Sequence, residues 1–235
     1  MKNIILCWSG GFDSTGVLLA NLEWLGQKDY AEDKLFVVSC YLENASNREE
    51  DRAARVKIKD YVYNQSGLDQ SILSRISFYE SVLDWHSPEG SSAWQSSVWA
   101  FLAGNSVILM ENSHCSVSFG YIKGDDFWHC RHEFEKIVRS IVDLNGSIKD
   151  RHSDYGVYFH YPYEWSTKKD ILVEYIKFPS VFGMISWGGD TESVKLKEKE
   201  DLENTLSLMK CSQTIKVLEK CTKQIDNKEF FGEGI

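Results

Sequence analysis

Residues 9–15, with the sequence Ser-Gly-Gly-Phe-Asp-Ser-Thr, carry the densest group of chemically useful residues in this chain. Gly10 and Gly11 let the backbone approach an anion with no Cβ in between. Three hydroxyls and a carboxylate come from the same run: Ser9, Ser14, Thr15 and Asp13. The hydroxyls can donate hydrogen bonds to phosphate oxygens, and the carboxylate can hold a metal ion or its bound water. We call residues 9–15 the glycine loop, and its composition is typical of a phosphate-binding site.

The segments on either side of the glycine loop must position it. Residues 3–8 form a short apolar run that predicts a buried strand. After the loop, apolar residues recur at the spacing of a helix: Val17, Leu18, Leu19, Leu22, Trp24 and Leu25. A strand, a glycine turn and a helix in this order aim backbone N–H groups and the positive end of the helix dipole at one anion. The alternative is a glycine turn or helix cap that binds nothing.

The glycine loop differs from two other phosphate-binding patterns. It lacks the Gly-Lys-Ser/Thr of a Walker P-loop and the third glycine of a dinucleotide fingerprint. Its order Ser-Gly-Gly-x-Asp-Ser resembles the PP-loop, the pyrophosphate loop of ATP pyrophosphatases, which cleave ATP between the α and β phosphates. The resemblance implies ATP and Mg²⁺ as cofactors, with Asp13 and Ser14 in catalysis. The expected ATP-binding residues are Trp8, Ser9, Gly10, Gly11, Asp13, Ser14 and Thr15.

Composition narrows the class of protein. The chain has 235 residues, 43% of them hydrophobic, which suits one α/β domain with an appendage. A net charge of −9 weighs against binding of a nucleic-acid backbone. The six cysteines are scattered, which favours reduced thiols over a disulfide framework. Without a signal-peptide pattern or a membrane-spanning apolar run, we expect a cytoplasmic protein that binds neither nucleic acid nor a membrane.

Apolar runs alternate with amphipathic segments along residues 1–187. Further strands are predicted at 35–41, 75–79, 115–121 and 158–161, and helices at 48–63, 91–110, 130–144 and 166–175. This alternation predicts an α/β fold, a Rossmann-like parallel sheet with helices on both faces and ligands at the carboxyl ends of its strands. Beyond Trp187 the chain becomes highly charged. We therefore expect a PP-loop domain at 1–187 and a helical C-terminal extension at 188–235, packed on the same domain.

A second group of polar and aromatic residues follows the fourth predicted strand. Residues 125–134 read Asp-Asp-Phe-Trp-His-Cys-Arg-His-Glu-Phe. Because they follow another carboxyl end, they can face the same crevice as the glycine loop. We call them the 125–134 segment.

Together with the glycine loop, the 125–134 segment resembles the 7-cyano-7-deazaguanine synthase family of PP-loop enzymes. That family carries Tyr-Pro-Asp-Cys-Arg-x-Glu-Phe at this place, and the matching residues here are Cys130, Arg131, Glu133 and Phe134. Phe127 stands at the aromatic position, while Trp128 and His129 replace Pro-Asp. The resemblance implies that ATP adenylates the carboxylate of a deazaguanine, that ammonia gives the amide, and that a second adenylation allows dehydration to the nitrile. It also implies a homodimer.

The expected substrate residues are Asp125, Asp126, Phe127, Trp128, Arg131 and Glu133. A flat ring needs stacking partners and polar groups along its edge, which the aromatic and acidic members can supply. Arg131, a further catalytic candidate, can hold a carboxylate or phosphate oxygen in a bidentate manner. The alternative for Arg131 is an ion pair with Glu135, four residues along the same helix.

Two departures from the family pattern leave the acceptor open. The family holds a structural zinc with four cysteines, whereas the tail offers only Cys211 and Cys221, so we expect no zinc. A family arginine is missing around residues 92–97. Two alternatives therefore remain: a PP-loop enzyme with a different acceptor, through amidation or tRNA modification, or a nucleotide-binding module that has lost catalysis.

Overall fold

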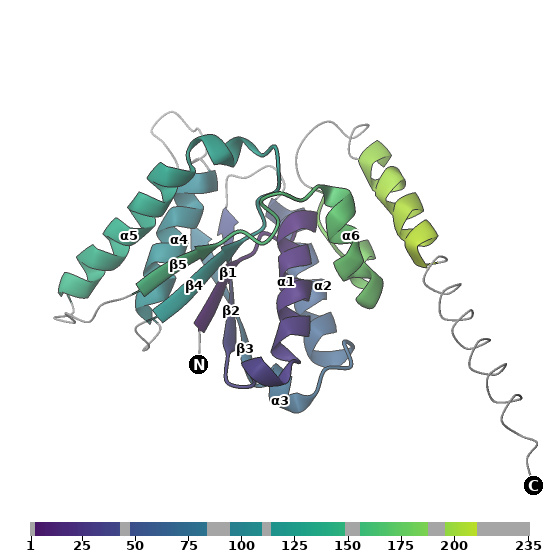
Figure 1. The fold of residues 1–235 in the computed structure, drawn as a ribbon, viewed down its shortest axis with the longest axis horizontal. Helices are drawn as coiled ribbons and strands as arrows, with labels where there is room; N and C mark the ends of the chain where they lie inside the picture. The colour runs from purple at the N-terminus through teal and green to yellow at the C-terminus, as the bar shows by residue number, and fades with distance from the viewer. Residues whose placement is uncertain are drawn as a thin grey trace, which may run out of the picture. The chain divides into compact units, whose positions relative to one another are not determined.

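Five parallel strands form one sheet in the order β3-β2-β1-β4-β5 (Figure 1). The strands are β1 (Asn3–Cys7), β2 (Lys34–Leu42), β3 (Ile76–Leu83), β4 (His114–Phe119) and β5 (Gly156–His160). The computed structural model describes residues 3–42, 48–83, 95–109, 114–148, 156–187 and 196–210. The chain divides into two compact units, Met1–Gly189, which contains the sheet, and Asp190–Ile235, in which residues 196–210 are helical.

β1 is the central strand of the sheet. All five of its residues are buried, and it pairs with β2 on one side and β4 on the other. In this register Ile5 lies between Phe36 of β2 and Val117 of β4. A parallel strand covered on both faces needs apolar residues on both. This requirement explains the unbroken apolar run that precedes the glycine loop.

Helices cover both faces of the sheet, which confirms the predicted α/β class (Figure 1). One face carries α1 (Phe12–Leu25), α2 (Arg48–Asn64) and α6 (Lys168–Lys177), and the other carries α4 (Gln95–Leu109) and α5 (Arg131–Ile148). The shorter turns are η1 (Lys28–Tyr30), α3 (Gln70–Leu73), η2 (Asp126–His129) and η3 (Val181–Gly183). None of the helices in the described ranges is long and apolar enough to cross a membrane.

The strand order reverses between β1 and β4. The chain first runs outward from β1 to β2 and β3, and then returns across the sheet to β4 and β5. In open parallel sheets, the crevice outside the carboxyl ends of the strands at such a reversal is the usual ligand site. Both predicted site segments follow strands that flank this reversal.

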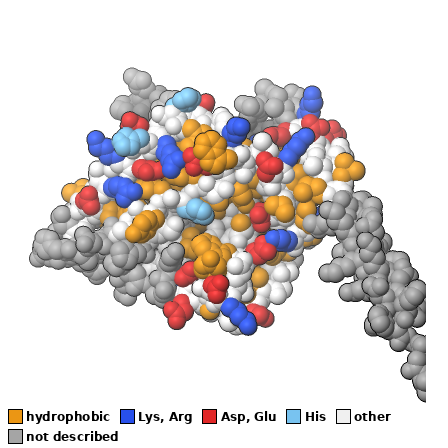
Figure 2. All heavy atoms as spheres, viewed as in Figure 1, with side chains coloured by type: hydrophobic (Ala, Val, Ile, Leu, Met, Phe, Trp, Pro, Cys, Tyr) orange, Lys and Arg blue, Asp and Glu red, His pale blue; other side chains and the backbone are white. Residues whose placement is uncertain are grey.

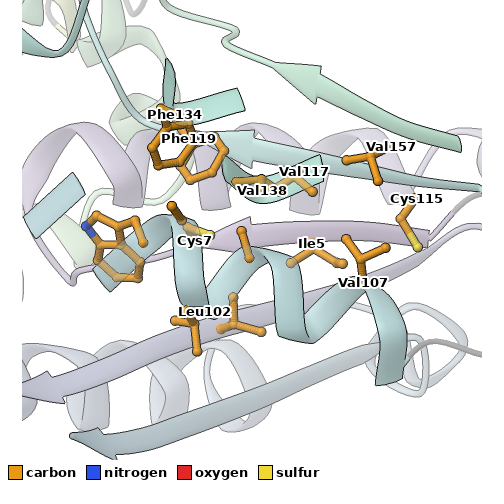
Figure 3. Close-up of a cluster of buried hydrophobic side chains, with 14 of the residues drawn as sticks. Ile5, Cys7, Leu102, Val107, Cys115, Val117, Phe119, Phe134, Val138 and Val157 are labelled. Atoms are coloured by element: carbon orange, nitrogen blue, oxygen red, sulfur yellow. The ribbon is translucent and has the colours of Figure 1, made fainter. Parts of the chain in front are cut away.

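The core between the sheet and helices α4 and α5 extends to the carboxyl ends of β1 and β4, where the two predicted site segments leave the sheet (Figure 3). Its labelled members are Ile5, Cys7, Leu102, Val107, Cys115, Val117, Phe119, Phe134, Val138 and Val157. Burying one large apolar side chain stabilises a fold by about 1.5–3 kcal/mol. Since Cys7 and Phe119 are the last residues of β1 and β4, the carboxyl ends of both strands are packed into this core.

Several element ends differ from the prediction. β4 ends at Phe119 rather than at residue 121, because Gly120 is already in contact with α1. β3 continues to Leu83 rather than ending at residue 79, since an edge strand tolerates polar residues on its exposed side. β5 covers Gly156–His160 rather than 158–161, and α5 runs on to Ile148. Residues 91–94 and 110 of the helix predicted at 91–110 lie outside the described residues.

Candidate functional site

The glycine loop leaves β1 and turns sharply into α1. Gly10 has a φ of 93°, in the left-handed region that favours glycine. Space is limited there too, since a Cβ on Gly10 would lie 2.9 Å from Cγ of Arg55. Gly11 is the N-cap of α1, which has 14 residues and begins at Phe12. The loop therefore leads directly to the backbone N–H groups at a helix N-terminus, the arrangement that binds anions.

Ser9 and Ser14 face each other across the loop. Their Oγ atoms are 2.9 Å apart, and the N–H of Ser9 donates to Ser14 Oγ at 3.3 Å. The N–H of Gly11 donates to Ser9 Oγ at 3.2 Å. A hydroxyl can rotate its proton between partners, so this pair can hold the loop closed and also donate to an added phosphate.

Trp8 and Thr15 support the loop from the inside. Both side chains are buried, and the indole N–H of Trp8 donates to Thr15 Oγ1 at 3.0 Å. This bond ties the end of β1 to the first turn of α1. Both residues were expected to bind ATP, and in this structure their side chains form an internal contact.

Asp13 lies partly buried in the first turn of α1, beside two tyrosines. Burial raises the pKa of Tyr163, and the negative charges of Glu174 and Asp13 raise it further. Burial also raises the pKa of Tyr175, with the Asp13 charge as the next cause. The Tyr175 hydroxyl donates to the carbonyl oxygen of Phe12 at 2.6 Å. The Asp13 carboxylate is thus placed near the positive end of the helix dipole, where a negative charge is stabilised.

Gly120 brings the end of β4 against the glycine loop. A Cβ on Gly120 would lie 2.6 Å from both N and Cα of Ser14 and 2.8 Å from the carbonyl carbon of Asp13. Such distances to backbone atoms cannot be relieved by a side-chain rotation, so only glycine fits. The close approach places the start of the 120–130 connection next to the first turn of α1. The two segments that sequence analysis singled out therefore leave the sheet side by side.

Asp125 and Trp128 close a turn after β4. Asp125 Oδ2 accepts the N–H of Ile122 at 2.8 Å, and the indole N–H of Trp128 donates to the Ile122 carbonyl at 2.6 Å. Burial is the main cause of the raised pKa of the Asp125 carboxyl. By contrast, Asp126 and Glu133 are exposed. Of the acidic substrate candidates, Asp125 holds the turn while the other two face solvent.

The aromatic substrate candidates stack on other protein rings. Phe127 is 5% exposed, and its ring lies parallel to that of Tyr121, with centroids 3.7 Å apart and an interplanar angle of 2°. Phe127 also meets Phe134 edge-on, with centroids 5.1 Å apart. Trp128 meets Tyr161 edge-on at 5.4 Å. Both candidates are thus brought together in one aromatic cluster next to the end of β4.

Arg131 forms the ion pair with Glu135 that was its predicted alternative role, and it forms a second ion pair with Glu164. Its Nε donates to Glu135 at 2.9 Å, and its Nη1 donates to Glu164 at 2.8 Å. The guanidinium also lies over the rings of Tyr161 and Trp128, 4.5 and 5.5 Å from their centroids. The hydrogen bond to Glu135 is the main cause that raises the pKa of Arg131. The structure therefore links α5 to the connection that follows β5 through this one side chain.

Two residues outside the predicted set hold the glycine loop. Arg55 of α2 is buried and donates from Nη1 to the Ser9 carbonyl at 2.9 Å. Ser186 donates its backbone N–H to the Gly10 carbonyl at 3.0 Å, and its hydroxyl bonds Asp51 of α2. The loop is thus fixed from two directions by segments distant in the sequence.

Arg55 does have a signal in the sequence. It falls within the buried repeat of α2 that also contains Ala54, Ile58, Tyr61 and Val62. A charged side chain on the buried face of an amphipathic helix needs a charged or polar partner. Ser186 has no such signal, because only the folded chain brings it to Gly10.

Comparisons with known proteins give a structural likeness and no sequence match. No protein-family model matches the chain, and no curated protein matches it. A solved structure of the U34-tRNA thiolase NcsA from Methanococcus maripaludis with its 4Fe-4S cluster is similar at 14% sequence identity and a TM-score of 0.49. The match covers 96% of this chain and 73% of that chain. The strand order and the placement of the helices on both faces of the sheet establish the α/β fold independently of this likeness.

Proposed function

We propose that this chain binds ATP on the glycine loop and cleaves it to AMP and pyrophosphate in order to activate a carboxylate. The observation that carries the proposal is the position of the loop at the reversal between β1 and β4, with Gly120 packed on the first turn of α1. The loop also has the Ser-Gly-Gly-x-Asp-Ser order that resembles a PP-loop. An anion-binding helix N-terminus thus coincides with the place in the sheet where ligands bind.

The residues of the loop suit the departure of pyrophosphate. The N–H groups at the start of α1 and the hydroxyls of Ser9 and Ser14 can neutralise the charge that develops on the leaving group. Asp13 fits a Mg²⁺ ion, because Mg²⁺ in nucleotide sites is held by one or two carboxylates together with phosphate oxygens. The residues that the structure describes contain no group of three His, Cys, Asp or Glu side chains that could hold a metal alone. Mg²⁺, when bound, would supply further charge neutralisation.

For the acceptor we propose a deazapurine carboxylate, with ammonia as the nucleophile. The support is the resemblance of the 125–134 segment to the 7-cyano-7-deazaguanine synthase family and the start of its connection beside the loop. Adenylation and attack by ammonia would release AMP and give the amide, and a second adenylation would permit dehydration to the nitrile. Arg131 already donates from Nε to Glu135 and from Nη1 to Glu164, so it can hold the carboxylate with its remaining N–H groups or by exchanging one of these partners for the ligand. The stack of Phe127 on Tyr121 must likewise open before Phe127 can touch a substrate ring.

Thiolation of RNA would instead need reactive cysteines and a basic surface. Burial raises the pKa of Cys7, and it raises the pKa of Cys40 and Cys115 to about 11, so these thiols stay protonated at neutral pH. The partly buried Cys130 donates its S–H to the Phe127 carbonyl at 3.3 Å. Figure 2 shows acidic and basic side chains interspersed on one face of the molecule, not a basic stripe. For the cysteines that the structure describes and the face drawn in Figure 2, these observations favour a small-molecule acceptor.

A nucleotide-binding module without turnover is the other alternative. The features that bear on it are the missing family arginine and the tail cysteines. Residues 92–94, Cys211 and Cys221 lie outside the described residues. A measurement of activity therefore distinguishes an enzyme from a nucleotide-binding module.

Incubation with Mg-ATP, ammonia and 7-carboxy-7-deazaguanine, followed by mass spectrometry of the products, tests the proposed acceptor. We expect AMP, pyrophosphate and the nitrile. AMP without amide or nitrile would indicate another acceptor, and ATP binding without AMP would indicate a module. A folded protein that does not bind ATP would overturn the assignment of the glycine loop.

A further inference from the structure

Arg55 carries a full charge in a buried position next to the glycine loop. Its side chain is only 5% exposed, whereas those of Arg52 and Arg131 are 48% and 36% exposed. Placing a guanidinium away from water is costly unless its charge and its N–H groups are matched. The hydrogen-bond and ion-pair partners of this buried guanidinium therefore indicate the role of Arg55.

The guanidinium of Arg55 connects the edge of the sheet to the glycine loop. Its Nε and Nη2 donate to Oε1 of Glu80 on β3, at 3.2 and 2.6 Å. Its Nη1 donates to the Ser9 carbonyl at 2.9 Å. The other oxygen of Glu80 lies 3.6 Å from Nε of Arg52. Glu80 thus fixes and neutralises the guanidinium, and one N–H remains directed at the loop backbone.

A bond to the Ser9 carbonyl also orients the next amide. The peptide unit is planar and trans, so the N–H of Gly10 points in the direction opposite to the Ser9 carbonyl. Arg55 holds that carbonyl on the α2 side, and the Gly10 N–H therefore points away from α2. Arg55 also packs close to Gly10, since its Cγ would lie 2.9 Å from a Cβ at that position, where φ is 93°.

We propose that Arg55 is a positioning residue for the pyrophosphate site: held by Glu80, it sets the orientation of the Ser9–Gly10 peptide so that the Gly10 N–H can donate to bound phosphate. This inference rests on the proposed function. Because Glu80 balances the charge, Arg55 acts through the geometry of its planar fork. A lysine keeps the charge but cannot bond the carboxylate and the carbonyl in the same fixed directions.

Two measurements test this role: the affinity for Mg-ATP by isothermal titration calorimetry, and the melting temperature. They are made on three single variants, described here, and on one double variant, described below. Arg55→Met and Arg55→Lys should each weaken ATP binding by about tenfold or more, the size expected for the loss of one charged hydrogen bond. Arg75→Met is the matched control, because Arg75 donates to the carbonyls of Tyr30, Asp33 and Leu25 at 2.7, 3.2 and 2.6 Å, away from the glycine loop. It should lower the melting temperature and leave ATP affinity unchanged.

The double variant Arg55→Met with Glu80→Leu separates positioning from stability. Removing both partners leaves no unpaired buried charge, so the melting temperature should recover relative to Arg55→Met alone. ATP binding should stay weak. Wild-type affinity in the double variant, or in Arg55→Lys, would overturn the inference. If the wild-type chain itself does not bind ATP while these changes in melting temperature persist, the proposed function has failed and the inference falls with it.

Discussion

Ser14 contributes to both the shape and the chemistry of the glycine loop. Its hydroxyl accepts the Ser9 N–H and lies 2.9 Å from the Ser9 hydroxyl. We expect Ser14→Ala to slow AMP formation by about a hundredfold or more, the size seen when a preorganised donor to a developing charge is removed. Steady-state measurement of AMP release checks this. Ser140→Ala is the control, since the Ser140 hydroxyl bonds the Lys136 carbonyl within α5, and an equal loss in both variants would refute the role of Ser14.

Gly120 is required by a contact between two backbones. A Cβ there would lie 2.6 Å from Ser14 N, so Gly120→Ala must push β4 and α1 apart. We expect this variant to lose about 1–3 kcal/mol of unfolding free energy, as overpacked sites do, and to bind ATP poorly. Urea unfolding measures the loss. Gly183→Ala should change stability by less than about 0.5 kcal/mol, because no atom beyond its neighbours in the chain lies within 4 Å of its added Cβ. Equal stability of the two variants would argue against the contact.

At the scale of elements, α6 offers a test that depends on pH. Its N-cap Thr167 donates from both its N–H and its hydroxyl to Asp170, each at 2.7 Å, and these bonds lower the pKa of the Asp170 carboxyl. A lowered pKa means that the bonds stabilise the fold above the ordinary Asp pKa of about 3.9 and cease to do so as pH falls through the lower folded value. Wild-type protein should therefore melt at a higher temperature than Asp170→Asn at pH 7. The difference should shrink below about pH 4, and a difference independent of pH would contradict the capping role.

Much of the fold could be predicted because its elements have local signals. The apolar run of β1, the glycine loop and the periodic residues of α1 are consecutive in sequence, and Thr167 with Asp170 marks the start of α6. The end of β4 was predicted two residues too late, since a contact with α1 and not a local pattern ends the strand. Local spacing also suggested the Glu135 partner of Arg131.

The contacts that complete the site join elements that are distant in sequence. Arg55 reaches Ser9 from α2, Ser186 bonds Gly10 from the segment after η3, and Glu164 reaches Arg131 after β5. No spacing rule relates such pairs, so sequence patterns could not predict them. The same reason applies to the burial of Phe127, whose stacking partners come from three separate segments.

For the molecule as a whole, the net charge of −9 does not favour an anionic ligand such as ATP. Binding must therefore depend on local donors and on a cation that screens the phosphates. We expect EDTA to abolish AMP formation and to weaken ATP binding, and excess Mg²⁺ to restore both. Calorimetric titration of ATP with and without Mg²⁺ measures the effect. AMP formation at an undiminished rate in EDTA would exclude the role given to Asp13 and Mg²⁺.

The bond that is broken in ATP distinguishes the proposed reaction from other uses of a phosphate-binding loop. Phosphorus NMR of wild-type protein with Mg-ATP, ammonia and 7-carboxy-7-deazaguanine follows every product at once. If the glycine loop acts as proposed, ATP disappears while AMP and pyrophosphate accumulate in equal amounts, and Ser14→Ala suppresses both. Formation of ADP and phosphate, or intact ATP in the presence of folded protein and acceptor, would show that the loop does not cleave ATP between its α and β phosphates.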